Sequence, residues 1–148
     1  MKKILFIIKS IPKSIAAGIM ATASGKKWFI LLLLSSNALA APSRALLDAI
    51  RQVESGGRCV YGDNGKAYGT YQVHECVIVD VNRRYKTHYT LACRGSDKKS
   101  REICRLYLTM WGKGRSQIEL ARIWNGGPKG YLKSATLKYA QQIEKAMK

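Results

Sequence analysis

Glycine-containing breaks divide residues 41–148 into short segments, several of which have apolar residues at helical spacing. The first segment starts at Ser43, a favoured N-cap residue, and stops at Gly56 and Gly57. Its apolar residues recur every three or four positions: Leu46, Leu47, Ile50 and Val53. This spacing predicts a helix with Glu54 in its last turn.

The next segments differ in how clearly they predict structure. Residues 58–73 mix aromatic and β-branched residues with glycines and a "GDNG" run, which indicates a small hairpin or an irregular loop region. The following run, "ECVIVDV", suits a strand or a helix by periodicity. Residues 97–111 form a clearer helical pattern before Gly112, with an apolar stripe of Ile103, Leu106, Tyr107, Met110 and Trp111.

Two more helices are expected near the C-terminus. Ser116 and Glu119 have the S-x-x-E spacing of a capping box, and the helix that they start ends at residues 125–128, "NGGP". The final segment predicts a one-sided apolar helix with Leu132, Ala135, Tyr139, Ile143 and Met147. Tyr139 is therefore expected on a buried stripe.

The first 40 residues have the order of a secretory signal. Six lysines without an acid precede the apolar run "WFILLLL" and small residues that end in Ala38-Leu39-Ala40. The apolar run is too short to cross a bilayer comfortably. We expect cleavage near Ala40, which places residues 41–148 in the periplasm or outside the cell as one small domain. An uncleaved N-terminal anchor is the alternative, because the basic region is unusually long.

The four cysteines all lie after residue 40: Cys59, Cys76, Cys93 and Cys104. Export to an oxidising compartment favours two disulfide bonds, and among three connectivities we expect Cys59–Cys76 and Cys93–Cys104. A zinc site is disfavoured, because the sequence has no C-x-x-C pair and its two histidines lack ligand-like spacing. We expect no metal and no other cofactor.

Residues 41–148 are strongly basic. Six of the 26 Lys and Arg residues precede residue 41 and all nine acids follow it, so 20 basic against nine acidic residues give a formal charge of +11. Such a field concentrates anionic partners, among them an anionic cell surface. Nucleic acid is disfavoured, because no recognised binding motif accompanies the basic residues Lys98, Lys99, Arg101 and Arg105.

Within the first predicted helix, Glu54 is the strongest candidate for a catalytic residue. It follows Ile50 by four residues and Leu47 by seven, so a helix places its carboxylate on an apolar side. Partial burial and the negative end of the helix dipole both raise the pKa of such a carboxyl group, as a general acid near neutral pH requires. The alternative is a solvated carboxylate that turns outward.

Four ordered motifs together resemble the lysozyme and soluble lytic transglycosylase superfamily. They are "ESGG" at 54–57, "YGTYQV" at 68–73, "ARIWNGGP" at 121–128 and "TLKY" at 136–139. The last two are also similar to invertebrate-type, destabilase-like lysozymes. The resemblance covers nearly all of residues 41–148. It implies an α+β, mainly α-helical domain with a small β-hairpin or loop region after the catalytic helix, and it favours a helix for "ECVIVDV".

The resemblance also implies roles for single residues. Glu54 falls on the catalytic acid, and Tyr139 falls on a late tyrosine whose hydroxyl orients that acid. The expected substrate-binding residues are Gly69, Tyr71, Gln72, Asn125 and Gly126. Tyr68 and Trp124 are further aromatic residues that can stack on sugar rings. The structural alternatives are a loop role for Gln72, a helix-capping role for Asn125, and a core position for each aromatic residue.

The reaction depends on a second carboxylate, since retaining and inverting glycosidases both use one. Asp63 is the nearest candidate, because it precedes Gly69 by six residues, close to where invertebrate-type lysozymes place their second acid. Its "GDNG" run is equally suited to a turn. Without Asp63, Glu54 acts alone as in lytic transglycosylases, where a substrate hydroxyl attacks to form an anhydro sugar. Glu75 and Asp80 are weaker alternatives.

We therefore expect an exported, monomeric enzyme that acts on peptidoglycan. It would cleave the β-1,4 bond between N-acetylmuramic acid and N-acetylglucosamine, as a muramidase or a lytic transglycosylase. Chitin-like oligomers are an alternative substrate. The alternative function is a non-catalytic cationic protein with the same fold, whose binding to a wall or membrane weakens with salt.

Overall fold

A computed structural model describes residues 41–148, and the predicted signal segment with its cleavage site lies outside this range. The described part has five α-helices, a small sheet and several 3-10 turns. The helices are α1 (Arg44–Ser55), α2 (Glu75–Tyr85), α3 (Asp97–Trp111), α4 (Gln117–Gly126) and α5 (Leu137–Ala146). This content confirms the predicted mainly helical α+β class and the helix expected for "ECVIVDV".

The predicted capping residues set the ends of the helices. Ser43 accepts a hydrogen bond from the Leu46 N–H at 3.0 Å and starts α1, and Gly56 ends it in the left-handed region with a φ of 61°. The capping box at the start of α4 is also present. The Ser116 hydroxyl accepts from the Glu119 N–H, and the Glu119 carboxylate accepts from the Ser116 N–H at 2.9 Å.

A three-stranded antiparallel sheet follows α1 and confirms the predicted hairpin region. Its strands β1 (Tyr61–Gly62), β2 (Ala67–Tyr68) and β3 (Val73–His74) lie in the order β1-β2-β3. Gly69 follows β2 with a φ of 88°, and a Cβ atom there would lie 1.9 Å from the Arg94 carbonyl oxygen. Only glycine fits this position without moving the neighbouring chain.

Hydrogen bonds tie this hairpin to two helices. The Ser55 hydroxyl at the end of α1 donates to the Thr70 carbonyl at 2.9 Å. The Asp97 carboxylate at the start of α3 accepts from the Thr70 hydroxyl at 2.8 Å and from the Arg51 guanidinium at 2.7 Å. Asp97 therefore joins α1, α3 and the hairpin through one side chain, and its hydrogen bond with Arg51 lowers the pKa of its carboxyl group.

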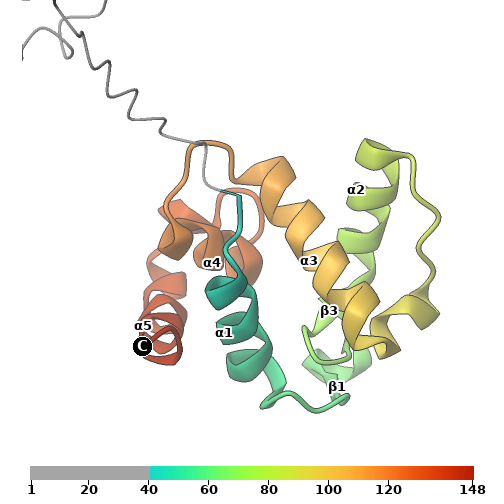
Figure 1. The fold of residues 1–148 in the computed structure, drawn as a ribbon, viewed down its shortest axis with the longest axis horizontal. Coiled ribbons are helices and arrows are strands. Elements are labelled where there is room, and N and C mark those ends of the chain that lie inside the picture. The colour runs from blue at the N-terminus through green and yellow to red at the C-terminus, as the bar shows by residue number, and fades with distance from the viewer. Residues whose placement is uncertain (1–40) are drawn as a thin grey trace, which may run out of the picture. The chain divides into compact units, whose positions relative to one another are not determined.

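The helices pack in two groups (Figure 1). Helices α1, α4 and α5 contact one another, α2 packs on α3, and α3 also contacts α1 and α4. The fully buried side chains that join the groups include Leu46, Ile50, Ile103, Leu108, Leu120, Ile123 and Ile143. Burial of these apolar side chains is the main stabilising term, at about 1.5–3 kcal/mol for each before the entropic cost.

Two predicted apolar stripes need correction. Trp111 is 42% exposed at the end of α3, and Leu132 is 68% exposed. Helix α5 begins only at Leu137, after the 3-10 turns Gly130–Leu132 and Ser134–Thr136. Hydrogen bonds from the Arg122 guanidinium to the Thr136 hydroxyl and the Lys133 carbonyl hold this irregular segment, so the helical pattern does not continue through it.

The predicted disulfide bonds Cys59–Cys76 and Cys93–Cys104 are wrong, since all four cysteines are free. Cys104 is fully buried in the core side of α3, where burial raises the pKa of its thiol well above the ordinary value. The Cys93 sulfur instead accepts a hydrogen bond from the Thr90 N–H at 3.4 Å. Cys59 and Cys76 are exposed on separate segments, so the fold of residues 41–148 is held by its core and hydrogen bonds.

None of the helices within residues 41–148 combines the length and apolar character that crossing a membrane requires.

Candidate active site

Glu54 and Tyr139 form the centre of the site. Glu54 lies in the last turn of α1, and Tyr139 lies in the first turn of α5, 85 residues later. Because α1 and α5 pack together, the Tyr139 hydroxyl reaches the carboxyl group and donates a hydrogen bond to Glu54 Oε1 at 2.8 Å. The structure therefore joins the predicted acid to the tyrosine predicted to orient it.

The surroundings of Glu54 favour its protonated form. Burial raises the pKa of the carboxyl group to about 7, although hydrogen bonds from Tyr139 and Trp124 act in the opposite direction. Burial and the neighbouring carboxylate raise the pKa of the Tyr139 hydroxyl well above its ordinary value. Tyr139 thus stays protonated and remains the donor. The raised pKa expected from the apolar side of α1 is confirmed, with burial as its main cause.

A cavity of about 230 Å³ opens beside Glu54. It brings together four segments: α1, the hairpin, the start of α2, and the C-terminal part of α4. The lining residues are Glu54, Asp63, Ala67, Gln72, His74, Val77, Trp124 and Asn125. Four residues predicted for the site, Glu54, Asp63, Gln72 and Asn125, therefore share one cavity.

Asp63 belongs to this cavity and also to a turn. It starts the short 3-10 segment Asp63–Gly65 and has a φ of 45°, as expected for a turn residue. It also lines the cavity, as expected for a second acid. Its side chain is about half exposed, and Oδ2 lies 3.7 Å from His74 Nε2. The weaker alternatives, Glu75 and Asp80, do not line the cavity.

Gln72 reaches the cavity from a constrained backbone. It has a φ of 50°, which a non-glycine residue rarely adopts. Its side-chain amide nitrogen donates to the carbonyls of Val60 and Gly69, each at 2.9 Å, and this holds the loop before β3. A Cβ atom at Gly62 would lie 1.9 Å from the Gln72 amide oxygen, so this neighbour must be small. The loop role and the cavity position coexist.

Asn125 and Gly126 are neighbours at the end of α4, but only one of them lines the cavity. Asn125 is exposed and lines the cavity, whereas Gly126 does not. The Gly126 carbonyl accepts a hydrogen bond from the Lys133 ammonium at 2.6 Å, and a Cβ atom at Gly126 would lie 2.6 Å from the Thr136 methyl carbon. Gly126 thus allows close packing of α4 on the following turn, and the C-cap of α4 is Gly127.

The prediction that Tyr71 contacts a sugar is wrong. Its side chain is fully buried in the core, and its hydroxyl accepts a hydrogen bond from the Arg101 guanidinium at 3.1 Å. Burial raises the pKa of this hydroxyl to about 12. Gly69 is also buried outside the cavity lining, and Tyr68 stacks on Tyr61 with ring centroids 4.2 Å apart.

His74 and Val77 also line the cavity, and neither was predicted from the sequence. No strand pattern marked His74, because Gln72 lies before β3 with a φ of 50° and the alternation of side chains along the strand does not extend to it. Trp124, one of the aromatic candidates, does line the cavity, and its indole packs edge-on against Tyr107 with centroids 5.8 Å apart. Within residues 41–148, no group of three His, Cys, Asp or Glu side chains is placed to hold a metal ion.

The chain has clear structural neighbours. The crystal structure of Aeromonas hydrophila PliI in complex with Meretrix lusoria lysozyme matches with a TM-score of 0.60 and 27% identity, over 72% of this chain and 91% of that one. Tapes japonica lysozyme matches with a TM-score of 0.59 and 25% identity, over 70% and 89%. Inhibitor-bound lysozyme from Meretrix lusoria matches with a TM-score of 0.59 and 27% identity, over 72% of this chain and 91% of that one. No family model and no curated protein matches the chain.

These matches define a lysozyme-like fold. Within that fold, the solved structures similar to this chain are invertebrate-type lysozymes, which confirms the resemblance predicted from the four motifs.

Proposed function

We propose that this protein is an exported muramidase that hydrolyses the β-1,4 bond between N-acetylmuramic acid and N-acetylglucosamine in peptidoglycan. One observation carries the proposal. Glu54 is partly buried with a pKa raised to about 7, accepts a hydrogen bond from Tyr139, and shares its cavity with a second acid, Asp63. A general acid and a second carboxylate in one cavity are what glycoside hydrolysis requires.

Glu54 would act first as the general acid. With a pKa of about 7, a substantial fraction of the carboxyl group carries a proton at neutral pH. Because Tyr139 donates to Oε1, the proton of Glu54 would lie on Oε2 and pass from there to the glycosidic oxygen. The leaving sugar then departs as an alcohol while positive charge develops at the anomeric carbon.

Asp63 would supply the second carboxylate. Its negative charge stabilises the developing positive charge at the anomeric carbon, and water completes hydrolysis after Glu54 has become a base. The half-exposed position of Asp63 keeps its carboxylate accessible to substrate and water. Gln72, Trp124 and Asn125 would contact the sugar from the other sides of the cavity.

Charge and similarity support the same substrate class. The formal charge of +11 on residues 41–148 suits an anionic wall polymer. The structural neighbours are lysozymes by their titles, and two of these structures hold the lysozyme with an inhibitor. Export through cleavage near Ala40 would bring this chain to the same polymer.

Digestion of purified cell walls tests the acid. Glu54→Gln should reduce the rate of wall solubilisation by roughly 10²–10⁴-fold, because the amide cannot donate the proton of a carboxylic acid. Glu144→Gln makes the same change of charge at an exposed position on α5 and should retain activity. Equal activity of wild type and Glu54→Gln would exclude the proposed role, and binding of walls without digestion by the wild type would favour a non-catalytic cationic protein.

Mass analysis of the released fragments tests the reaction. Hydrolysis leaves a hydrated reducing end, whereas a lytic transglycosylase leaves an anhydro end that is lighter by one water. We expect hydrated ends. Anhydro ends would show that Glu54 acts without Asp63 as a partner.

A further inference from the structure

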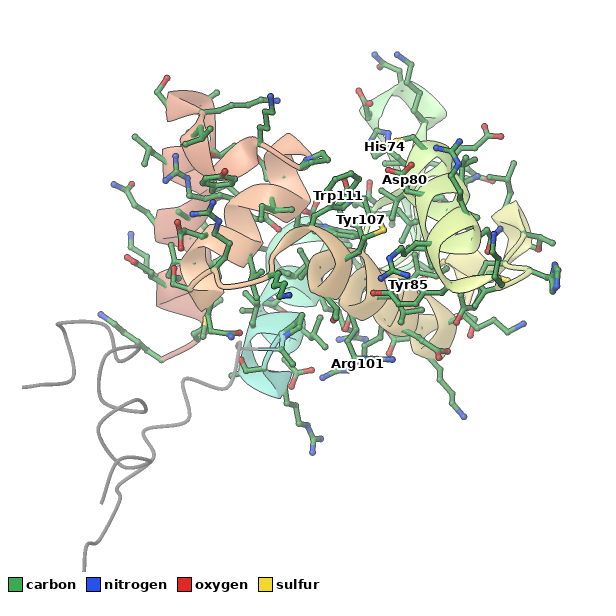
Figure 2. All side chains as sticks on the ribbon, turned by 90° about the horizontal axis from the view of Figure 1, so that it is seen from above. His74, Asp80, Tyr85, Arg101, Tyr107 and Trp111 are labelled. Atoms are coloured by element: carbon green, nitrogen blue, oxygen red, sulfur yellow. The ribbon has the colours of Figure 1, made fainter. Side chains whose placement is uncertain are left out.

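A second cavity lies at the C-terminal ends of α2 and α3. It has a volume of about 440 Å³ and is lined by Asp80, Arg83, Arg84, Lys86, Met110 and Trp111. Asp80 and Trp111 come from the neighbouring faces of the two packed helices (Figure 2). An indole that is 42% exposed beside a thioether and three basic side chains combines a flat apolar surface with positive charge.

Helix α2 contributes residues to both cavities, and each cavity has one tryptophan, from α4 in the first and from α3 in the second. On α2, Val77 lines the first cavity, and Asp80 and Arg84 follow it by three and seven residues on the same face. On the other side, Trp124 lines the first cavity and packs edge-on against Tyr107. Trp111 lies one turn beyond Tyr107 on α3. On α2, the two cavities therefore lie one helical turn apart, at Val77 and Asp80.

The second cavity carries uncompensated positive charge. Its only acid, Asp80, lies 4.0 Å from Arg83. Arg84 packs over the Tyr85 ring at 5.5 Å, and neither Arg84 nor Lys86 forms an ion pair with any acid of residues 41–148. Both side chains are exposed, so their charged ends are available to an anionic ligand.

We propose that the second cavity binds a carboxylate-bearing sugar unit of the glycan whose bond is cleaved in the first cavity. The ring of an N-acetylmuramyl residue lies against Trp111, and its lactyl or peptide carboxylate pairs with Arg84 and Lys86. This inference rests on the proposed function and deepens it. It assigns the protein a preference for anionic peptidoglycan over uncharged chitin oligomers of equal length.

Binding measurements separate this site from the reaction. The Glu54→Gln protein is titrated with peptide-bearing glycan, with glycan stripped of its peptides, and with a chitin oligomer of the same number of sugars. Adding Arg84→Gln and Lys86→Gln should weaken binding of the anionic glycans roughly fivefold at low salt and leave chitin binding unchanged. If only the peptide-bearing glycan binds more weakly, the peptide carboxylate is the group that pairs with Arg84 and Lys86. If the stripped glycan loses affinity equally, the lactyl carboxylate is that group.

A matched control removes the same charge elsewhere. Lys98→Gln with Arg105→Gln neutralises two basic residues of a different cavity and should change binding of all three ligands by less than twofold. Trp111→Ala should weaken both anionic glycans and chitin, since a sugar face stacks on an indole irrespective of charge. Unfolding curves of each variant verify that the fold is intact.

Kinetics on the active protein give the second readout. Arg84→Gln with Lys86→Gln should raise KM for anionic glycan and leave kcat unchanged, because these residues lie outside the reacting cavity. Equal binding by this variant and its parent, or an equal effect of the control pair, would overturn the inference. A wild type that binds anionic glycan preferentially but cleaves none would instead overturn the proposed function and leave the second site standing.

Discussion

Glu54 and Asp63 line one cavity but belong to very different parts of the molecule. Glu54 lies in a helix that packs on the core, and a tyrosine from the far end of the chain holds its carboxyl group. Asp63 lies in a short turn, its side chain is about half exposed, and its Oδ2 lies 3.7 Å from His74 Nε2. Packing of the whole domain therefore sets the environment of Glu54, whereas local backbone geometry positions Asp63.

This difference explains how two carboxyl groups can take separate roles. Burial raises the pKa of the Glu54 carboxyl group because it penalises the charged form. The helix side of the cavity thus suits a proton donor, and the hairpin side suits an exposed carboxylate. Substitutions on the two sides of the cavity should therefore differ in their effects on activity and stability.

The largest expected effect is on catalysis. Asp63→Asn should lower the rate of wall hydrolysis by more than about 100-fold, because a neutral amide does not stabilise positive charge at the anomeric carbon. Glu75→Gln serves as the control, since Glu75 is exposed outside the cavity. The initial rate of release of soluble fragments is the measurement. If Asp63→Asn lowers the rate by less than threefold, Asp63 has no catalytic role and Glu54 acts without it.

Stability should respond to pH through Glu54. The pKa of its carboxyl group is about 7 in the folded protein and 4.5 for the unperturbed group, so folding binds the proton more tightly. The corresponding stability is fully present below pH 4.5 and is lost as the pH rises through 7. Glu54→Gln has no such loss, because its amide does not ionise in this range.

The free energy of unfolding of Glu54→Gln relative to wild type should therefore increase between pH 4.5 and pH 7. We expect the increase to reach about 3 kcal/mol above pH 8. Urea unfolding at several pH values measures it, with Glu144→Gln as the surface control. A constant difference across this range would contradict burial of Glu54 as the cause of its raised pKa.

Tyr139→Phe should have a smaller effect on the same side of the cavity. Loss of the hydrogen bond to Glu54 Oε1 should reduce activity about tenfold, through poorer orientation of the acid. The Tyr139 hydrogen bond lowers the pKa of Glu54, so its removal raises that pKa. The basic limb of the pH–rate profile should accordingly move to higher pH. A shift to lower pH would show that Tyr139 acts by another route.

The smallest effect is expected on the hairpin side. His74→Gln removes a neighbour of Asp63 at 3.7 Å, but both side chains are at least 40% exposed. Exposed pairs contribute at most about 1 kcal/mol, so activity should fall by less than about fivefold and the effect should shrink at high salt. Rates at two ionic strengths test this. A loss as large as that of Asp63→Asn would make His74 a positioning residue of equal importance.

The helix side of the site could be predicted well from the sequence. Capping residues defined both ends of α1, and helical spacing placed Glu54 on an apolar side. The pairing with Tyr139, however, joins residues 85 positions apart, and no local pattern contains that information. It followed only from the resemblance to a known family.

The hairpin side was harder to predict, because its strands are two residues long and its conformation depends on unusual backbone angles. Tyr71 and Gln72 are neighbours, yet Tyr71 enters the core and Gln72 lines the cavity. The sequence does not show which aromatic residue of such a segment turns inward. The disulfide prediction failed similarly, since it rested on the expected compartment and on cysteine number, whereas pairing requires proximity.

Asp97 has a consequence for the order in which the domain folds. Its carboxylate accepts hydrogen bonds from Thr70 in the hairpin, 27 positions away along the chain, and from Arg51 in α1, 46 positions away. Two-residue strands do not persist by themselves, so we expect the hairpin to become ordered only after α1 and α3 have met. Amide hydrogen exchange across residues 60–74 should then be faster than in α3. The last part of the protein to form would be the wall that carries Asp63, and a partly folded chain would hold its acid without its second carboxylate.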